Sequence, residues 1–122
     1  MPPGPTPTIA PRTSDEWHDW LAENHETVDS VWLKLAKQGA GVPSPTYDEA
    51  VEVALCFGWI DGLARGLDER YRLQRFTPRR KRSNWSRRNR DRATALIESG
   101  RMQPAGLREV ERAKEDGRWD AA

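Results

Sequence analysis

The scarcity of aliphatic residues is the feature that most limits what this chain can fold into. Leucine, isoleucine, valine and phenylalanine together account for 20 of its 122 residues, a level typical of chains that do not form a core. Six tryptophans supply the missing apolar area, because each indole buries on the order of 200 Å². We therefore expect one domain whose small core is built around tryptophan.

The N-terminal segment 1–12 differs in composition from the rest of the chain. It contains five prolines and almost no apolar periodicity, which predicts a disordered leader over 1–12 and a single domain over 13–122. No window reaches the roughly 18 apolar residues of a membrane span. The single cysteine, Cys56, forms no internal disulfide. We expect a cytoplasmic protein with no membrane association and no metal or other cofactor.

Capping signals and apolar periodicity predict four helices. "TSDE" (13–16) and "TYDE" (46–49) have the form of capping boxes, in which a Thr side chain and a Glu side chain satisfy free backbone amides. They open helices over about 14–25 and 46–57, the second of which ends at Gly58. A third helix is predicted from Ser83 to Ser99, and a fourth runs from Pro104 to Gly117.

Two-residue alternation predicts three strands. In "DSVWLKLAKQG" (29–39), Val31, Leu33 and Leu35 alternate with the residues between them, as in a half-buried strand. The segments 59–64 and 70–77 are rich in β-formers and are joined by a hairpin connection. The order α-β-α-β-β-α-α predicts an α+β fold in which about four helices pack on a small antiparallel three-stranded sheet. The strand order does not follow from the sequence.

The first candidate site residues lie on the predicted hairpin. Trp59 and Asp61 share one face of their strand, and an aspartate between apolar neighbours needs a partner. Arg75, on the same strand face as Tyr71, is the expected partner because a guanidinium binds a carboxylate through two parallel hydrogen bonds. Two interpretations stay open: the pair fixes the register of the hairpin, or these four residues line one wall of a polar, aromatic pocket.

The second group of candidate residues lies in 79–92, which contains eight basic residues and one acid. Arg79 and Arg80 belong to a loop before a helix that Ser83 is expected to cap, and a helix N-terminus favours anions. The segment therefore predicts a site for a phosphate or carboxylate, with Trp85 stacking on a ring and Asn89 forming a hydrogen bond. A solvated basic surface is the main alternative explanation of the same residues, and a nucleic-acid-binding module is a less favoured one.

The overall charge balance weighs against a protein dedicated to nucleic acids. The formal net charge is +1 and the isoelectric point is about 7.9, whereas dedicated binding domains are more basic. A small metal-independent enzyme is a further alternative. His25 is best explained by its place near a helix C-terminus, Cys56 as a buried small residue, and Ser83 has no histidine near it in the sequence.

Six motifs resemble the YdeI/OmpD-associated protein family, whose members are described as bacteriocin-protection proteins. The motifs are "EWHDWLAENH", "VWLKLAK", "TYDEAVEVALCFGWIDG", "RFTPRRKRSNWSRRN", "LIESGRMQPAG" and "AKEDGRW". They span about 13–119 and occur in the order found in the family. The resemblance implies a small cytoplasmic protein that protects against antimicrobial agents and stress, and it carries no catalytic residues over to this chain.

The sequence thus predicts a protection protein that binds a small or peptidic ligand with anionic and aromatic groups, without catalysis, as a monomer or weak homodimer. The two tryptophans are expected to share one open hollow with the basic loop. The predicted ligand-binding residues are Trp59, Asp61, Tyr71, Arg75, Arg79, Arg80, Ser83, Trp85 and Asn89.

Overall fold

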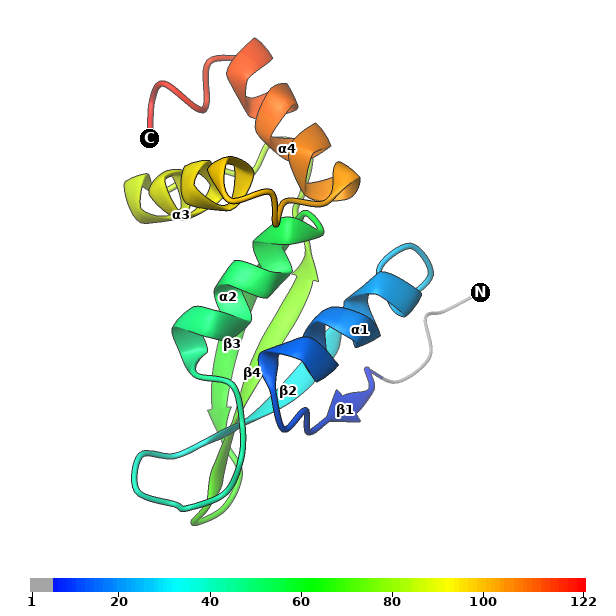
Figure 1. Cartoon of the computed structure of the whole chain (residues 1–122), viewed down its shortest axis with the longest axis vertical. Helices are drawn as coiled ribbons and strands as arrows, with labels where there is room; N and C mark the ends of the chain where they lie inside the picture. The colour runs from blue at the N-terminus through cyan, green and yellow to red at the C-terminus, as the bar shows by residue number, and fades with distance from the viewer. Residues whose placement is uncertain (1–5) are drawn as a thin grey trace.

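Two helices cover one face of a four-stranded sheet in the computed structural model, which describes residues 6–122 (Figure 1). The α+β class predicted from the sequence is confirmed. Along the chain the elements are β1 (Thr8–Ile9), α1 (Ser14–Asn24), β2 (Val31–Ala36), α2 (Tyr47–Cys56), β3 (Trp59–Gly66), β4 (Tyr71–Pro78), α3 (Arg87–Glu98) and α4 (Pro104–Glu115).

The sheet has one strand more than the three predicted, because part of the proline-rich leader pairs with it. The strand order is β1-β2-β4-β3, with β1 parallel to β2 and the other pairs antiparallel. Thr8 pairs with Trp32, and Ile9 packs against the core. A two-residue strand is too short to give an alternation signal, which is why the sequence did not predict it. Residues 1–5 of the expected leader lie outside the described residues.

Both predicted capping segments start helices, but only one forms a complete capping box. At α2, Thr46 Oγ1 accepts from Glu49 N at 3.1 Å, and Glu49 Oε1 accepts from Thr46 N at 2.8 Å. At α1, Thr13 Oγ1 accepts from Glu16 N at 3.1 Å, while the Glu16 carboxylate pairs with Arg12 instead. Either arrangement satisfies free amides of the first turn and so fixes where the helix begins.

The core lies between the sheet and the two helices. Val31, Leu33 and Leu35 of β2 point into it, as their alternation predicted. Trp17 of α1 is fully buried against Phe76 of β4, with ring centroids 5.3 Å apart, and its Nε1 donates to a backbone carbonyl of α2 at 3.0 Å. A buried indole whose N–H is satisfied contributes its apolar area without an unpaired donor.

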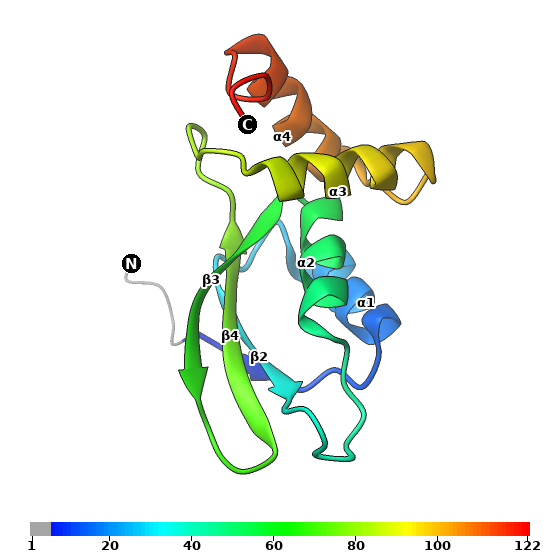
Figure 2. The same cartoon turned by 90° about the vertical axis from the view of Figure 1, so that its left-hand side faces the viewer.

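Helices α3 and α4 lie together at one end of the sheet, beyond the C-terminal end of α2 (Figures 1 and 2). Helix α2 ends where Gly58 adopts a left-handed conformation with φ of 75°, as predicted. The loop before α3 is longer than predicted: Ser86, not Ser83, caps the helix by accepting from Asn89 N at 3.1 Å. Ser83 therefore lies in the loop and is free of a capping role.

None of the helices among residues 6–122 has the length and apolar character needed to cross a bilayer.

Candidate functional site

The two tryptophans expected to share an open hollow are buried in different parts of the molecule. Trp59 is 1% exposed and meets Trp20 of α1 edge to face, with centroids 6.2 Å apart. Trp85 is 6% exposed and meets Trp119 after α4, with centroids 5.2 Å apart. Neither indole presents a free ring face to solvent, so the pair does not form the ligand site that the sequence suggested.

Asp61 and Arg75 lie on opposite faces of the sheet, and the predicted ion pair between them is not formed. Asp61 pairs in register with Phe76 and so faces the helices, where it accepts a short hydrogen bond from the Tyr47 hydroxyl. Arg75 is the neighbour of Phe76 in β4 and therefore points to the other face. An irregularity in the β3–β4 register between Asp61 and Ala64 separates the two halves of the strand, which simple alternation could not anticipate.

The pKa of the Tyr47 hydroxyl reports on its contact with Asp61. Burial raises the pKa of Tyr47 to about 12, and the hydrogen bond to Asp61 and the charge of Asp61 raise it in the same direction. Because this value lies above the roughly 10 of an unfolded tyrosine, the stabilising contribution is complete below pH 10. It is lost as the pH rises through about 12.

We predict that Asp61→Asn lowers the pKa of Tyr47, because it removes the charge that opposes ionisation. The measurement is ultraviolet titration of tyrosinate in a Tyr71→Phe background, where Tyr47 is the remaining tyrosine of the chain. Glu69→Gln, at an exposed position in the hairpin turn, serves as the control and should leave the transition in place. An unchanged transition in Asp61→Asn would show that burial alone sets the pKa.

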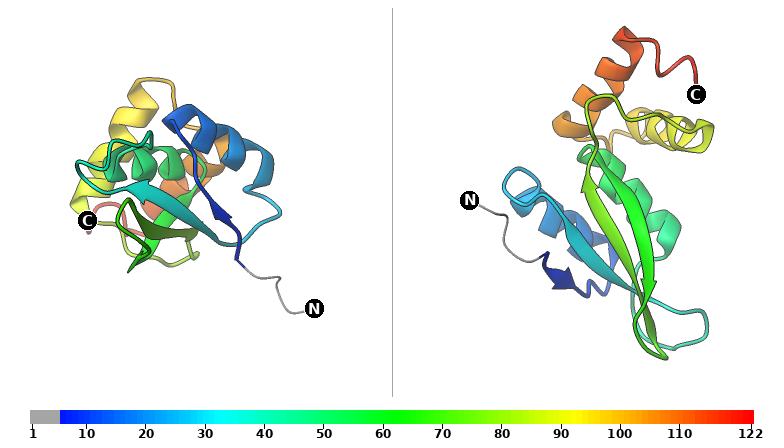
Figure 3. Two further views of the ribbon diagram at one scale, coloured as in Figure 1. Left: turned by 90° about the horizontal axis from the view of Figure 1, so that it is seen from below. Right: turned by 180° about the vertical axis from the view of Figure 1, so that it is seen from behind.

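The face of the sheet opposite α1 and α2 is left uncovered by the described part of the chain (Figure 2; Figure 3, left). Its side chains come from the residues that alternate with the buried ones. Trp32 lies opposite Arg75 across β2 and β4, Lys34 lies opposite Leu73, and Ala36 lies opposite Tyr71. We call this surface the open face. Among the described strands, its outward positions carry no acidic residue.

Cationic groups lie over both aromatic rings of the open face. The guanidinium carbons of Arg65 and Arg75 lie 5.2 Å and 6.0 Å from the centroid of the Trp32 ring. Lys34 Nζ lies 5.7 Å from the centroid of Tyr71. These contacts hold three positive charges beside two π-surfaces without a carboxylate between them. Arg75 Nε is also buried without a hydrogen-bond partner.

Charge is divided unevenly between the two sides of the molecule, although the net charge is +1. Residues 13–58, which include α1 and α2, contain nine acidic and two basic residues, whereas residues 59–92 contain twelve basic and four acidic residues. The first range supplies the helices over the covered face, and the second supplies β3, β4, the basic loop and the first half of α3, which holds four of the twelve basic residues. The net charge is therefore close to zero because an acidic part of the chain and a basic part offset each other.

The loop 79–86 continues the basic side from the end of β4. Arg80, Lys81 and Arg82 are exposed, and the loop projects toward the side of the open face (Figures 2 and 3). Asn89, one turn into α3, accepts from Arg92 Nη1 at 2.9 Å and is thus engaged within its own helix. Of the predicted loop residues, Arg80 is placed to meet a partner on the surface.

Arg79 is the exception in this loop because its side chain is turned inward. The residue is 7% exposed, and its guanidinium carbon lies 3.9 Å from the centroid of the Trp85 ring. Burial, together with the neighbouring charge of Arg118, lowers the pKa of Arg79 to about 10, although Glu109 and Asp61 oppose the shift. The group remains charged at neutral pH.

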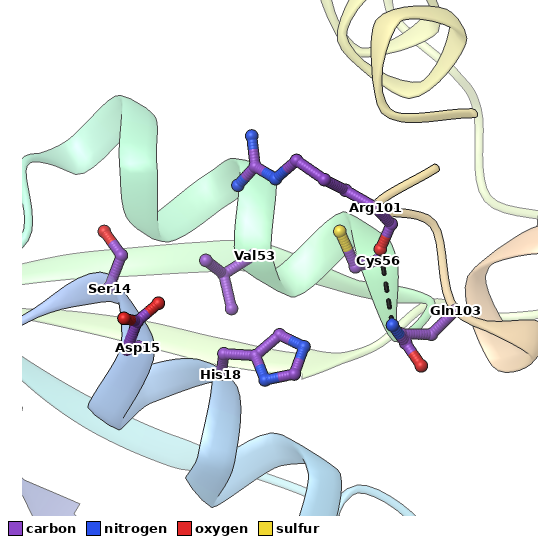
Figure 4. Close-up of a pocket in the computed structure, with 7 residues that line it drawn as sticks. All are labelled: Ser14, Asp15, His18, Val53, Cys56, Arg101 and Gln103. Carbon is purple, nitrogen blue, oxygen red and sulfur yellow. Dashed lines mark hydrogen bonds between the residues drawn. The ribbon is translucent and has the colours of Figure 1, made fainter. Parts of the chain in front are cut away.

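A pocket of about 170 Å³ lies between α1, α2 and the segment that joins α3 to α4 (Figure 4). It contains none of the residues predicted to bind a ligand. Cys56 lies in its wall beside His18, and burial raises the pKa of the thiol to about 11. The thiol is therefore protonated at neutral pH and a poor nucleophile. The other lining residues are Ser14, Asp15, Val53, Arg101 and Gln103.

Sequence reasoning missed three residues of the open face: Trp32, Lys34 and Arg65. Trp32 and Lys34 could have been identified from the sequence. The alternation in 31–36 that buries Val31, Leu33 and Leu35 places the residues between them on the other face. For Arg65 there was no such signal, since the register irregularity lies between it and the start of its strand. Tyr71 and Arg75 were predicted as site residues, and the structure brings them together with this set.

Comparison with known proteins corrects the family suggested by the motifs. Residues 9–109 match the model of a family described as a domain of unknown function, DUF8412. The resemblance to the YdeI/OmpD-associated family was wrong, because its motifs consist largely of capping, turn and tryptophan signals that small α+β domains share. The chain has no match among the curated proteins and none among the solved structures.

Proposed function

We propose that this chain, which belongs to the DUF8412 family, binds single-stranded nucleic acid on the open face of its sheet. One observation carries the proposal. The open face combines the rings of Trp32 and Tyr71 with the cations Lys34, Arg65 and Arg75, and its outward strand positions bear no acid in the described chain. Aromatic platforms surrounded by positive charge are the recurring device for holding unpaired bases and their phosphates.

The energetics suit this ligand. Each base that stacks on an aromatic side chain contributes about 1–3 kcal/mol, and the contribution depends little on which base it is. Each phosphate that a lysine or arginine neutralises releases counterions, which makes the affinity fall with salt. Two rings and three cations on one surface can therefore hold a few nucleotides with little sequence preference.

The exposed arginines of the basic loop lengthen the site. Arg80 and Arg82 lie on the loop that leaves the end of β4, on the side of the open face. A strand whose bases stack on Trp32 and Tyr71 can extend its backbone toward this loop, where further phosphate contacts are available. This arrangement unites the basic segment with the sheet residues Tyr71 and Arg75, which the sequence had assigned to a small-ligand pocket.

Other occupants of the open face fit its chemistry less well. A second copy of the chain would bring the two sets of lysine and arginine together, which like charges disfavour. Duplex nucleic acid keeps its bases stacked and paired, so the rings of Trp32 and Tyr71 would find no partner. A small ligand enclosed between Trp59 and Trp85 has no support, because both indoles are buried apart.

The proposed role is binding without catalysis. We also propose that the protein is cytoplasmic, because its single cysteine, Cys56, is a free thiol, which suits a reducing compartment. The protective role against bacteriocins followed from the family resemblance alone, and the residues of the open face give no separate argument for it.

The test is binding of a labelled single-stranded oligonucleotide of about 12 nucleotides, a common site size, measured by fluorescence anisotropy over a series of salt concentrations. We expect the double variant Trp32→Ala, Tyr71→Ala to bind about tenfold or more weakly. Neutralising Lys34 and Arg65 to Gln should make the slope of log K against log salt shallower by about 0.7 per lost phosphate contact.

Arg108→Gln, an exposed charge on α4, is the matched control and should leave both affinity and slope unchanged. Thermal melts of every variant report whether the fold persists. The proposal is wrong if the double variant folds and binds as well as the parent, or if a duplex of the same length binds more tightly than the single strand.

A further inference from the structure

Four hydrogen-bond donors are buried without a partner beside the basic loop. They are Arg79 Nε, Arg79 Nη1, Ser83 Oγ and Arg118 Nη2. Buried donors are almost always satisfied in folded proteins, so four orphaned groups on three neighbouring side chains need an explanation. None of the three side chains belongs to the open face.

Backbone contacts hold the two arginines next to each other. Arg79 Nη2 donates to the carbonyl of Asn84 at 2.9 Å, and Arg118 Nη1 donates to the carbonyl of Ser83 at 2.6 Å. The two guanidinium groups thus bind the consecutive carbonyls of Ser83 and Asn84, and the orphaned hydroxyl belongs to Ser83 itself. The orphaned donors therefore belong to side chains that contact the same short stretch of loop.

Of the two arginines, Arg79 has no ion-pair partner among the described residues, whereas Arg118 has one. No carboxylate among those residues lies within salt-bridge distance of Arg79, and Arg118 is paired to Asp116 through Nε alone, at 2.8 Å. The Trp85 ring offsets part of the cost of burying Arg79, but a ring satisfies neither of its two free N–H groups. Burying a cation without a counter-charge is costly enough that proteins normally supply one.

We propose that Arg79, Ser83 and Arg118 form a binding site for a phosphate group. Phosphate would supply the counter-charge that Arg79 lacks, and arginine is the side chain best suited to bind its oxygens through more than one hydrogen bond. Donors that come from three side chains fit the tetrahedral arrangement of four oxygens better than the planar pair of a carboxylate. The site is independent of the open face and of the function proposed for it.

Access to the site runs past Arg118. The side chain of Arg118 is 14% exposed, and it lies on the turn that follows α4, next to Trp119. The contacts that hold this turn to the loop include the hydrogen bond of Arg118 to Ser83 and the edge contact of Trp119 with Trp85. Entry of phosphate therefore requires the Arg118 side chain to move aside and then to return, so that its free Nη2 also binds the ligand.

The experiment is thermal unfolding of the protein in inorganic phosphate and in sodium chloride of equal ionic strength, followed by isothermal titration with phosphate. A ligand that binds the native state raises Tm by mass action, and we expect a rise on the order of 5 °C over the chloride sample at phosphate concentrations well above Kd. Arg79→Lys and Ser83→Ala should each weaken phosphate binding by about tenfold, because each removes donors to a charged ligand.

Arg87→Lys is the matched control, since Arg87 is exposed at the start of α3, directly after the same loop, and it should bind phosphate as the parent does. Ser83→Ala keeps the test valid if Arg79→Lys fails to fold. It removes a hydroxyl that makes no hydrogen bond in the structure, so the variant should fold as the parent does. Equal Tm values in phosphate and chloride, or an unchanged affinity in a folded Ser83→Ala protein together with Arg79→Lys, would overturn the proposal.

A second arm identifies the source of the phosphate. A 5′-phosphorylated oligonucleotide is compared with its unphosphorylated form in the parent and in Arg79→Lys. A preference for the phosphorylated form that Arg79→Lys abolishes assigns the site to a terminal phosphate. Equal binding of the two forms, with the phosphate-dependent rise in Tm retained, assigns it to free phosphate.

Discussion

Replacing Gly106 with alanine is expected to destabilise the fold by about 3 kcal/mol. A Cβ atom at this position would lie 2.4 Å from the carbonyl oxygens of Leu55 and Cys56 and 2.5 Å from the sulfur of Met102. Two of these atoms belong to the backbone at the end of α2, so the clash cannot be relieved by rotating a side chain. Helix α4 would have to move away from α2, and the contact that fixes the two elements together would be lost.

A loss of stability in Gly106→Ala would point to the clash, because alanine is a better helix former than glycine and helix propensity alone would increase stability. In an exposed helix interior the same substitution is favourable by up to about 1 kcal/mol. Urea unfolding gives the free energy directly. Gly66→Ala is the control, since nothing lies within 4 Å of a Cβ at that position and its φ is not positive. If Gly106→Ala is as stable as the parent, α4 does not approach α2 as closely as the structure shows.

Trp59→Ala is expected to cost about 3–5 kcal/mol, as truncation of large buried side chains does. The indole is 1% exposed and lies at the start of β3, against Trp20 and the rest of the core. A chain with so few aliphatic residues cannot refill the space that the indole leaves. We therefore expect Trp59→Ala to be largely unfolded at temperatures where the parent is native.

Trp32→Ala is the comparison that separates a structural tryptophan from a binding one. Trp32 is only partly buried and lies on the open face, so its removal should cost much less stability than that of Trp59. Near-ultraviolet circular dichroism and urea unfolding of both variants make the comparison. A larger loss of stability in Trp32→Ala than in Trp59→Ala would mean that the open face is covered in solution.

Local signals were sufficient to predict most elements of the fold. The reciprocal bonds of Thr46 and Glu49 and the left-handed Gly58 act within one helix, so a short stretch of sequence contains all the information that defines them. The start of α3 was placed too early because Ser83 and Ser86 are equally good caps. In the structure Ser83 lies in a turn, where its N–H donates to the carbonyl of Arg80 and its carbonyl accepts from Arg118, which is 35 residues away.

The site was harder to predict because its residues are brought together by the sheet. Tyr71 and Arg75 were identified from their own strand, but their neighbours Trp32 and Lys34 come from β2, and the sequence does not state that β2 pairs with β4. Asp61 was assigned to the wrong partner because the irregularity in β3 was not predicted. The family resemblance failed for a related reason: short motifs record local structure, which many unrelated domains have in common.

The uneven division of charge along the chain means that the net charge of +1 does not describe the field near any one part of the surface. Acidic residues are concentrated in 13–58, which includes α1 and α2, and basic residues are concentrated in 59–92, which includes β3, β4, the loop 79–86 and the start of α3. In the field of a polyanion such a molecule experiences a torque well before contact, so it turns its open face forward while it is still diffusing. Collisions that bring the open face to the ligand are then favoured, even though the protein is nearly neutral.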